Sequence, residues 1–168
     1  FGFCDDPPTL AHATIIKEAL KSGLVENVIV FPAGKLSYKS FSADREERMK
    51  MTELWASAAQ FPKTIHISFF DMQRKEAFKW IDLLEHVTFL APDLKHFFII
   101  GSDQYQEIKT SWTRGDELLK KASFIVAPRK GFLEDFPIEK ISFSRHYLLP
   151  LSPLESSSTE VREGDLSM

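Results

Sequence analysis

The sequence predicts an α/β protein with a Rossmann-like fold, an open and mostly parallel sheet with helices on both faces. Two observations favour this fold class. Short apolar segments alternate along the chain with longer segments of helical periodicity, and this alternation is typical of βαβ units. The apolar segments also lack the polar alternation of half-exposed strands, which indicates strands that are covered on both faces.

Five apolar segments are expected to form strands, the last of them with the weakest pattern. They lie at 25–31, 64–70, 96–101, 123–128 and 140–149. Phe1 and Gly2 look like the last residues of a further strand, so we expect that strand to begin before Phe1.

Four segments between these strands have helical periodicity, at 12–23, 43–59, 74–87 and 115–122. Gly23 is a natural stop for the first of them. Ligands of open parallel sheets bind beyond the carboxyl ends of the strands. We therefore expect functional residues in the segments that follow strands.

The composition excludes several classes of protein. The chain has 168 residues, enough for one domain, which we expect to span 1–168. No apolar run approaches the roughly 18 residues needed to cross a membrane, and no signal peptide is visible. We therefore expect a cytoplasmic protein without a membrane partner, and the sequence leaves a homo-oligomer open.

The net charge and the cysteine content exclude further classes of partner and metal site. The net charge of −3 argues against a nucleic-acid partner bound through a broad basic surface. Cys4 is the single cysteine, which rules out an intrachain disulfide and a CxxC zinc site. A small anionic ligand needs only a few local cations, so it remains compatible with this composition.

Thr9 and His12 stand at the start of the first expected helix, after the turn formed by DDPP. Thr9 is a good N-cap residue, and a residue three positions later faces the same side of the first turn. The N-terminus of a helix favours a phosphate. The pair therefore predicts a triphosphate-binding site, although T-x-x-H alone also fits an ordinary helix cap.

A second helix start is expected near the end of the chain, in SSSTEVR. Ser157 and Glu160 fit a capping box, a routine way to begin a helix. Hydroxyl groups followed by Arg162 also suit a second phosphate site. We expect the two helix starts to close together into one nucleoside-triphosphate site.

The motifs occur in a recognisable order. FGFCDDPPTLAH is similar to G-G-[ST]-F-D-P-x-[HT]-x-G-H, and SSTEVR is similar to S-[ST]-T-x-[IV]-R. Together they resemble the nicotinate/nicotinamide mononucleotide adenylyltransferases of the nucleotidyltransferase superfamily. Further matches to that family lie between them, at Pro32, Ala33, Gly34, Lys39, Arg48, Met51, Gly101, Asp103, Trp112, Arg129 and Gly131.

The resemblance implies a reaction and a set of site residues. The adenylyl group of ATP would pass to nicotinate or nicotinamide mononucleotide in NAD biosynthesis, with Mg²⁺ bound alongside ATP. The catalytic residues would be His12, Thr9 and Arg162. Contacts with ATP would come from Gly2, Phe3, Cys4, His12, Gly101, Asp103, Ser157, Ser158, Thr159 and Arg162. Contacts with the mononucleotide would come from Lys39, Trp80, Trp112 and Arg129.

Some positions depart from the family pattern. Phe3 stands where the family has a glycine, Asp5 stands where it has a phenylalanine, and EAFKW at 76–80 replaces G-P-S-Y-T. Two alternatives follow from these departures. One is a superfamily member with a different phosphorylated acceptor, and the other is a catalytically weak nucleotide-binding or chaperone-like module.

Overall fold

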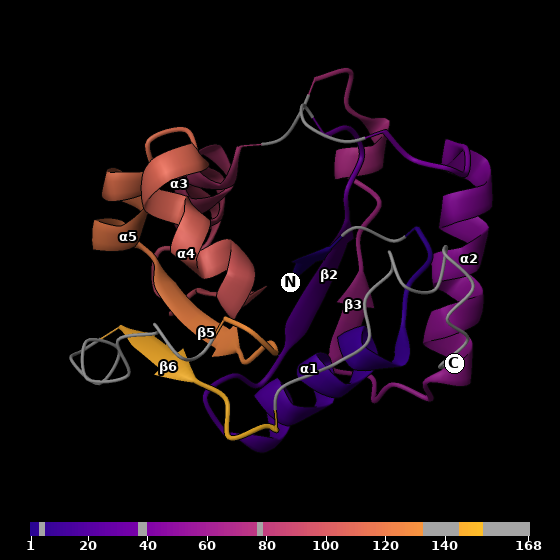
Figure 1. Cartoon of the computed structure of the whole chain (residues 1–168), viewed down its shortest axis with the longest axis horizontal. Coiled ribbons are helices and arrows are strands. Elements are labelled where there is room, and N and C mark those ends of the chain that lie inside the picture. The colour runs from indigo at the N-terminus through magenta and orange to yellow at the C-terminus, as the bar shows by residue number, and fades with distance from the viewer. Residues whose placement is uncertain (4–5, 37–39, 77–78, 133–144, 153–168) are drawn as a thin grey trace. The chain divides into compact units, whose positions relative to one another are not determined.

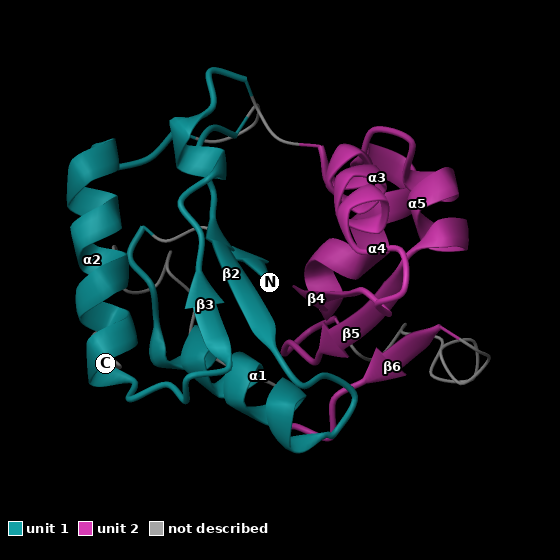
Figure 2. Ribbon diagram, turned by 180° about the vertical axis from the view of Figure 1, so that it is seen from behind, with its two compact units in different colours: residues 1–78, 155–168 teal, residues 79–154 magenta. Residues whose placement is uncertain are grey.

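The computed structural model of the chain describes residues 1–3, 6–36, 40–76, 79–132 and 145–152 (Figure 1). The chain divides into two compact units, shown in different colours in Figure 2. Unit 1 comprises residues 1–78 and 155–168, and unit 2 comprises residues 79–154. The expectation of one domain over 1–168 stays a prediction.

Unit 1 is built around a sheet of three parallel strands in the order β1-β2-β3. Val30, in the central strand β2, pairs with Ile67 and is fully buried. The elements of the unit are β1 (Gly2–Phe3), α1 (Leu10–Lys21), β2 (Val28–Pro32), α2 (Arg45–Ala58), β3 (Ile65–Ile67) and the short 3-10 helix η1 (Asp71–Gln73).

Helix α1 follows directly from its sequence. Thr9 is its N-cap, and Ile15, Ile16 and Ala19 lie on its buried face, as expected for residues three and four positions apart. Gly23 follows the helix with a φ of +72°, a conformation that glycine adopts without a steric cost. The predicted stop at this glycine is confirmed.

Unit 2 contains a second sheet of three parallel strands, in the order β4-β5-β6. All five residues of β5 are buried, so this strand forms the centre of the unit's core. The elements of the unit are α3 (Trp80–Leu90), β4 (Phe97–Gly101), α4 (Ser102–Ser111), α5 (Gly115–Lys121), β5 (Ser123–Ala127) and β6 (His146–Leu148).

Most expected elements are confirmed, with shifted ends. The strands at 25–31, 64–70, 96–101 and 123–128 appear as β2, β3, β4 and β5, and β6 lies within 140–149. The helix expected at 74–87 begins later, at Trp80, because Lys79 before it has an extended backbone. Helix α4 was not expected, since its sequence is mostly polar and it buries only Ser102 and Ile108.

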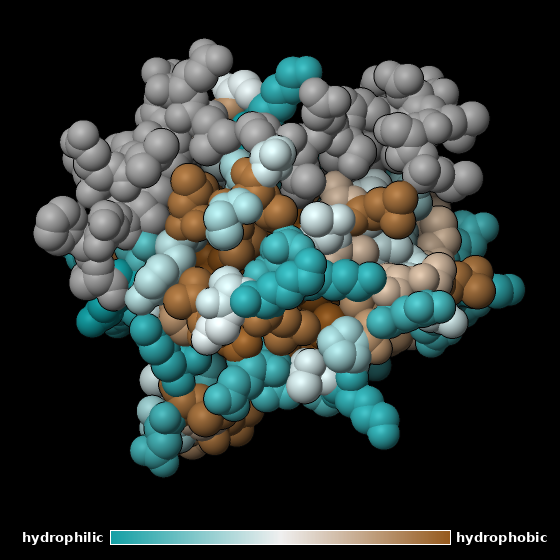
Figure 3. All heavy atoms as spheres, turned by 90° about the horizontal axis from the view of Figure 1, so that it is seen from below, coloured by the Kyte–Doolittle hydropathy of each residue, from teal (hydrophilic) through white to brown (hydrophobic). Residues whose placement is uncertain are grey.

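The surface carries scattered apolar side chains. On the face shown in Figure 3, hydrophobic atoms lie exposed among hydrophilic ones. The most exposed of the large apolar residues are Leu10, Leu54, Phe89, Leu90 and Leu94. Single exposed apolar residues are normal on proteins of this size, so they indicate no site by themselves. Within the described ranges, no helix is long and apolar enough to cross a bilayer.

Gly115 provides a first test of the packing in unit 2. A Cβ atom at this position would lie 1.8 Å from the carbonyl oxygen of Ile108, because α4 and α5 approach each other closely there. Gly115→Ala should lower the free energy of unfolding by about 1–3 kcal/mol, measured by urea denaturation. The control Lys120→Ala changes an exposed side chain of α5 and should stay within about 0.5 kcal/mol of the parent. Equal stabilities of the parent and Gly115→Ala would contradict the packing of α4 against α5.

His146 makes unit 2 sensitive to pH. Its ring stacks on Phe124 with 5.3 Å between centroids, and its Nδ1 atom lies 3.1 Å from the hydroxyl of Tyr105. Burial lowers the pKa of His146 below its ordinary value, although a backbone hydrogen bond at Leu119 opposes this effect. The neutral ring is therefore favoured in the folded protein.

The direction of the pH effect follows from this lowered pKa. Above the unfolded-state pKa of about 6.5 the contribution of His146 is complete, and it is lost as the pH falls through the folded-state pKa. The melting temperature should thus fall between about pH 7.5 and about pH 5.5, and His146→Gln should flatten that dependence. The matched change at exposed His86 should leave it as in the parent. An unchanged slope in His146→Gln would contradict this role of His146.

Candidate active site

The first part of the site is the turn between β1 and α1. Thr9 is 7% exposed and has the extended backbone of an N-cap residue. The indole nitrogen of Trp55 donates a hydrogen bond to the Thr9 carbonyl at 2.9 Å. The start of α1 is therefore held from inside unit 1, and its first-turn N–H groups point out of the helix end.

His12 is fixed in one orientation by this turn. Its Nδ1 atom accepts a hydrogen bond from the backbone N–H of Thr9 at 3.0 Å, and the Thr9 hydroxyl lies 3.1 Å from the same atom. A backbone N–H can only donate, so Nδ1 is the acceptor, and the neutral ring carries its proton on Nε2. The expectation that Thr9 and His12 face the same side of the first turn is confirmed.

Phe3, the bulky departure from the family pattern, is a core residue. Its side chain is 6% exposed, and its ring packs against His12 at 4.8 Å and against Trp55 at 5.4 Å between centroids. The phenyl ring thus supports the His12 ring within unit 1. Trp55 also contacts Phe61, so Trp55 is a packing residue of unit 1.

Two buried charged residues of unit 1 were not among the predicted core residues. Asp6 is 3% exposed, and its carboxylate accepts the backbone N–H groups of Ser42 at 2.7 Å and Ala43 at 3.2 Å. Arg48 is buried as well, with a side chain that is 2% exposed, although it lies in the mostly charged run REERMK. The sequence offers one signal for the burial of Arg48. It is a charged residue at a helical position that should face the core.

In unit 2, Gly101 and Asp103 lie where β4 passes into α4, and Arg129 follows β5. Asp103 Oδ2 forms an ion pair with Arg129 Nη1 at 2.8 Å, and the Ser102 hydroxyl accepts the Arg129 backbone N–H at 2.9 Å. A Cβ atom on Gly101 would lie 2.2 Å from Asp103 Oδ1. The three predicted residues are therefore neighbours at the carboxyl ends of adjacent strands.

Trp80 and Trp112, both predicted to contact the mononucleotide, lie together in unit 2. Their rings are nearly parallel, with 16° between planes and 5.7 Å between centroids. Trp80 also packs edge-on against Phe98 at 5.2 Å. Two flat aromatic surfaces of this kind suit the recognition of a planar heteroaromatic ring.

Several predicted site residues lie outside the described residues, and the closing of the two helix starts into one site lies outside them too. These residues are Cys4, Lys39, Ser157, Ser158, Thr159 and Arg162. The part of the chain that the structure describes contains no group of three or more His, Cys, Asp or Glu side chains placed to hold a metal ion.

Comparisons with known proteins identify the family. A family model described as cytidylyltransferase-like matches residues 4–164. Probable nicotinate-nucleotide adenylyltransferases from Albidiferax ferrireducens and Clostridium botulinum are each 30% identical to the chain. The alignments cover 96% and 94% of this chain, and 82% and 80% of the two relatives. The chain belongs to the nicotinate-nucleotide adenylyltransferase family. As a member it is a nucleotidyltransferase, and the predicted resemblance is confirmed.

Solved structures agree with this adenylyltransferase family. The nicotinic acid mononucleotide adenylyltransferase of Plasmodium falciparum, complexed with NaAD, aligns with a TM-score of 0.83 and 25% identity. The same enzyme complexed with APC aligns with a TM-score of 0.79. Each alignment covers 96% of this chain and 80% of the parasite chain. The predicted α/β class of this adenylyltransferase is confirmed.

Proposed function

We propose that this chain transfers the adenylyl group of ATP to nicotinate mononucleotide, giving nicotinate adenine dinucleotide and pyrophosphate in NAD biosynthesis. The observation that carries the proposal is the Thr9–His12 pair at the start of α1, in a chain of the adenylyltransferase family. Nicotinate is chosen over nicotinamide because the relatives are named for nicotinate and one solved relative is complexed with NaAD.

The reaction joins the two nucleotides by one displacement. An oxygen of the mononucleotide 5′-phosphate attacks the α-phosphorus of ATP and forms a new P–O bond. The bond from the α-phosphorus to the bridging oxygen breaks, and pyrophosphate leaves with the bonding electrons. Catalysis of this kind depends on positioning and on stabilising the charge that develops on the phosphoryl oxygens.

His12 suits the stabilising role. The Thr9 N–H occupies Nδ1, so the neutral ring offers an N–H donor at Nε2. The positive end of the α1 dipole adds to the attraction for an anion at the helix N-terminus. No proton transfer is required of His12, because its hydrogen bond strengthens as negative charge builds up on the α-phosphate.

Other residues are assigned from the sequence pattern. Arg162 would neutralise the triphosphate, and Gly101 and Asp103 would contact ATP. Lys39 would bind a phosphate group, and Trp80 and Trp112 would bind the pyridine ring. Because Arg129 pairs with Asp103, we expect it to orient that carboxylate as well as to contact the mononucleotide.

Mg²⁺ belongs to the proposal as a partner of ATP. It usually keeps several waters and is held through one or two carboxylates and the substrate phosphates, so it needs no acidic cage of the kind absent from the described residues. When bound, it would neutralise charge on the phosphates. A cytoplasmic location and self-association are further parts of the proposal.

The assay for this function is simple. The protein is incubated with MgATP and either nicotinate or nicotinamide mononucleotide, and the products are separated by chromatography. We expect a dinucleotide and pyrophosphate with nicotinate mononucleotide, and slower formation with nicotinamide mononucleotide. ATP binding without any dinucleotide from either substrate would instead favour a different acceptor or a catalytically weak module.

A further inference from the structure

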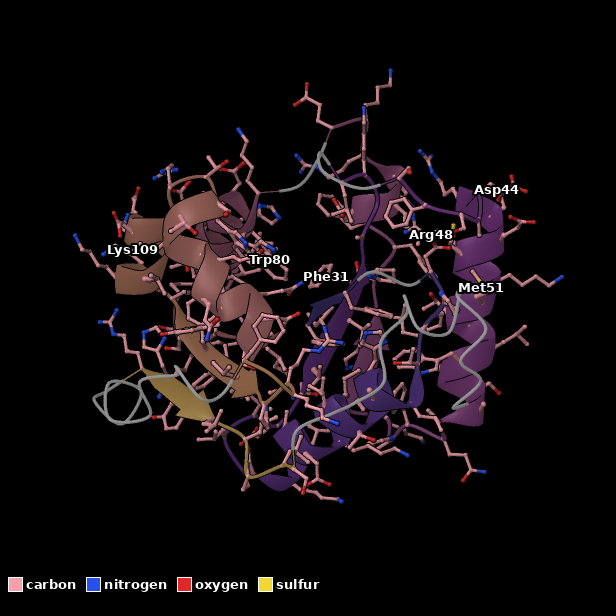
Figure 4. All side chains as sticks on the ribbon, viewed as in Figure 1. Phe31, Asp44, Arg48, Met51, Trp80 and Lys109 are labelled. Carbon is pink, nitrogen blue, oxygen red and sulfur yellow. The ribbon has the colours of Figure 1, made fainter. Side chains whose placement is uncertain are left out.

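The stacked indoles of Trp80 and Trp112 come from the ends of two different helices of unit 2. Trp80 is the first residue of α3 (Figure 4), and its ring packs on Phe98, a buried residue of β4. Trp112 is the C-cap of α4 and begins the turn that leads to α5. The position of the Trp112 ring, and with it the stacking of the two indoles, therefore depends on how this turn is held against α3.

The turn from Trp112 to Gly115 is short and closely packed. The carbonyl of Trp112 accepts the N–H of Gly115 at 3.0 Å, and the N–H of Trp112 donates to the carbonyl of Ile108. Between them, Arg114 has a φ of +56°, a left-handed conformation that is uncommon for residues other than glycine and asparagine. Such a conformation persists where surrounding contacts enforce it, and the side chain of Arg114 makes several.

The guanidinium of Arg114 joins the start of α5 to α3. Its Nε and Nη2 atoms donate to the two carboxylate oxygens of Glu117 at 2.7 Å and 2.8 Å, and Nη2 also donates to Glu85 Oε1 at 2.8 Å. Glu117 lies in the first turn of α5, and Glu85 lies on α3. A planar guanidinium that binds two carboxylates fixes their orientation as well as their distance. Arg114 therefore ties the turn that carries Trp112 to the helix that begins with Trp80.

The exposure of these ion pairs limits what they contribute to folding. The side chains of Arg114, Glu85 and Glu117 are 44%, 50% and 34% exposed. Exposed ion pairs add little to stability, so we expect Arg114 to matter more for the placement of the turn than for the stability of unit 2. Hydrogen bonds from Arg114 and Lys121 lower the pKa of Glu117 to about 2, so this carboxylate stays ionised at neutral pH.

We propose that Arg114 is a positioning residue for the acceptor nucleotide, because it holds the Trp112 ring beside Trp80 and so completes the flat surface on which the pyridine ring stacks. The proposal rests on the proposed function and deepens it. Arg114 touches no reacting atom. Its effect reaches the substrate through Trp112, so it should appear in the binding of the mononucleotide and not in the binding of ATP.

Arg114→Asn and Glu85→Ala each break the link to α3. Asparagine adopts a left-handed conformation readily, so Arg114→Asn should fold, and its side chain is too short to reach both carboxylates. In each variant the Kd for nicotinate mononucleotide, titrated through tryptophan fluorescence, should rise about threefold, the factor that corresponds to one exposed ion pair. The double variant should bind no more weakly than either single variant. Arg114→Lys keeps a charge for one carboxylate and should show a smaller rise.

Lys121→Met is the matched control. Lys121 also pairs with Glu117, at 2.7 Å, but both residues belong to α5, so this pair does not reach α3. The control should keep the parent Kd for the mononucleotide, and every variant should keep the parent Kd for ATP. Three results would overturn the proposal: equal changes in both Kd values, an unchanged Kd for the mononucleotide in Arg114→Asn, or no binding of the mononucleotide to the parent.

A second measurement needs no substrate. Two stacked indoles couple their electronic transitions and give a pair of circular dichroism bands of opposite sign. Trp80→Phe should abolish this pair of bands, and Trp55→Phe should leave it, since Trp55 lies in unit 1. Arg114→Asn and Glu85→Ala should weaken the bands. Bands that are absent from the parent, or unchanged in both variants, would overturn the link between Arg114 and the stacked indoles. If the parent forms no dinucleotide but the Kd values and the bands respond as expected, the proposed function fails while the positioning role stands.

Discussion

His12→Ala should lower kcat for dinucleotide formation by about 10²–10³-fold, the usual effect of removing one donor that stabilises a developing negative charge. The Nε2–H donor would be lost, while the rest of the first turn of α1 would remain. Because the stabilisation grows in the transition state, the KM for ATP should change much less than kcat. Steady-state kinetics with saturating mononucleotide measure both quantities.

The controls separate catalysis from folding. His12→Ala also removes the acceptor of the Thr9 N–H, which should cost the protein about 1 kcal/mol of stability, so assays belong well below the melting temperature. His86→Ala removes an exposed histidine of unit 2 and should leave kcat unchanged. If His12→Ala stays folded and keeps the parent kcat, His12 takes no part in the reaction.

Trp112→Ala should raise the KM for nicotinate mononucleotide about tenfold to about 100-fold, the range expected when one aromatic stacking partner of a flat ring is lost. Trp112→Phe should keep part of the affinity, because a phenyl ring still offers a flat surface. The KM for ATP should stay close to that of the parent, since ATP is assigned to other residues.

Trp80 provides the matched comparison, because its ring stacks on that of Trp112. If the mononucleotide uses both rings, Trp80→Ala should raise the same KM. If Trp80 only supports the ring of Trp112, Trp80→Ala should raise this KM less than Trp112→Ala does. The two variants should then lose a similar free energy of unfolding. A KM unchanged by Trp112→Ala would exclude Trp112 from the pyridine site.

The fold class could be predicted because the strands are the most apolar short segments of the chain. β5 is buried along its whole length, and its sequence SFIVA shows this directly. Helix α4 could not be predicted in the same way. It packs against α5, where Gly115 allows close contact with Ile108, and this tertiary contact leaves no regular apolar pattern in SDQYQEIKTS.

The site could be predicted in part. Thr9 and His12 lie three residues apart in the first turn of α1, so their spacing alone predicts that they meet. Asp6 and Asp71 bind backbone groups at residues 34–43, more than 30 residues away in the sequence. No local sequence pattern indicates these partners, because it is the fold of the intervening chain that brings them together.

Some site predictions stand on the family resemblance alone. Lys39, Ser158 and Arg162 lie outside the described residues, so their roles stay predictions. Trp80 and Trp112 were both assigned to the mononucleotide from the resemblance, and their stacking in unit 2 gives a physical reason to treat them together.

The central claim is that the adenylyl group moves, and one labelling experiment tests it directly. The protein is incubated with Mg²⁺, nicotinate mononucleotide and ATP radiolabelled at either the α-phosphate or the γ-phosphate. We predict that the α-label appears in the dinucleotide and the γ-label in pyrophosphate. Transfer of the γ-label to the acceptor, or no transfer of the α-label at all, would contradict the proposed reaction.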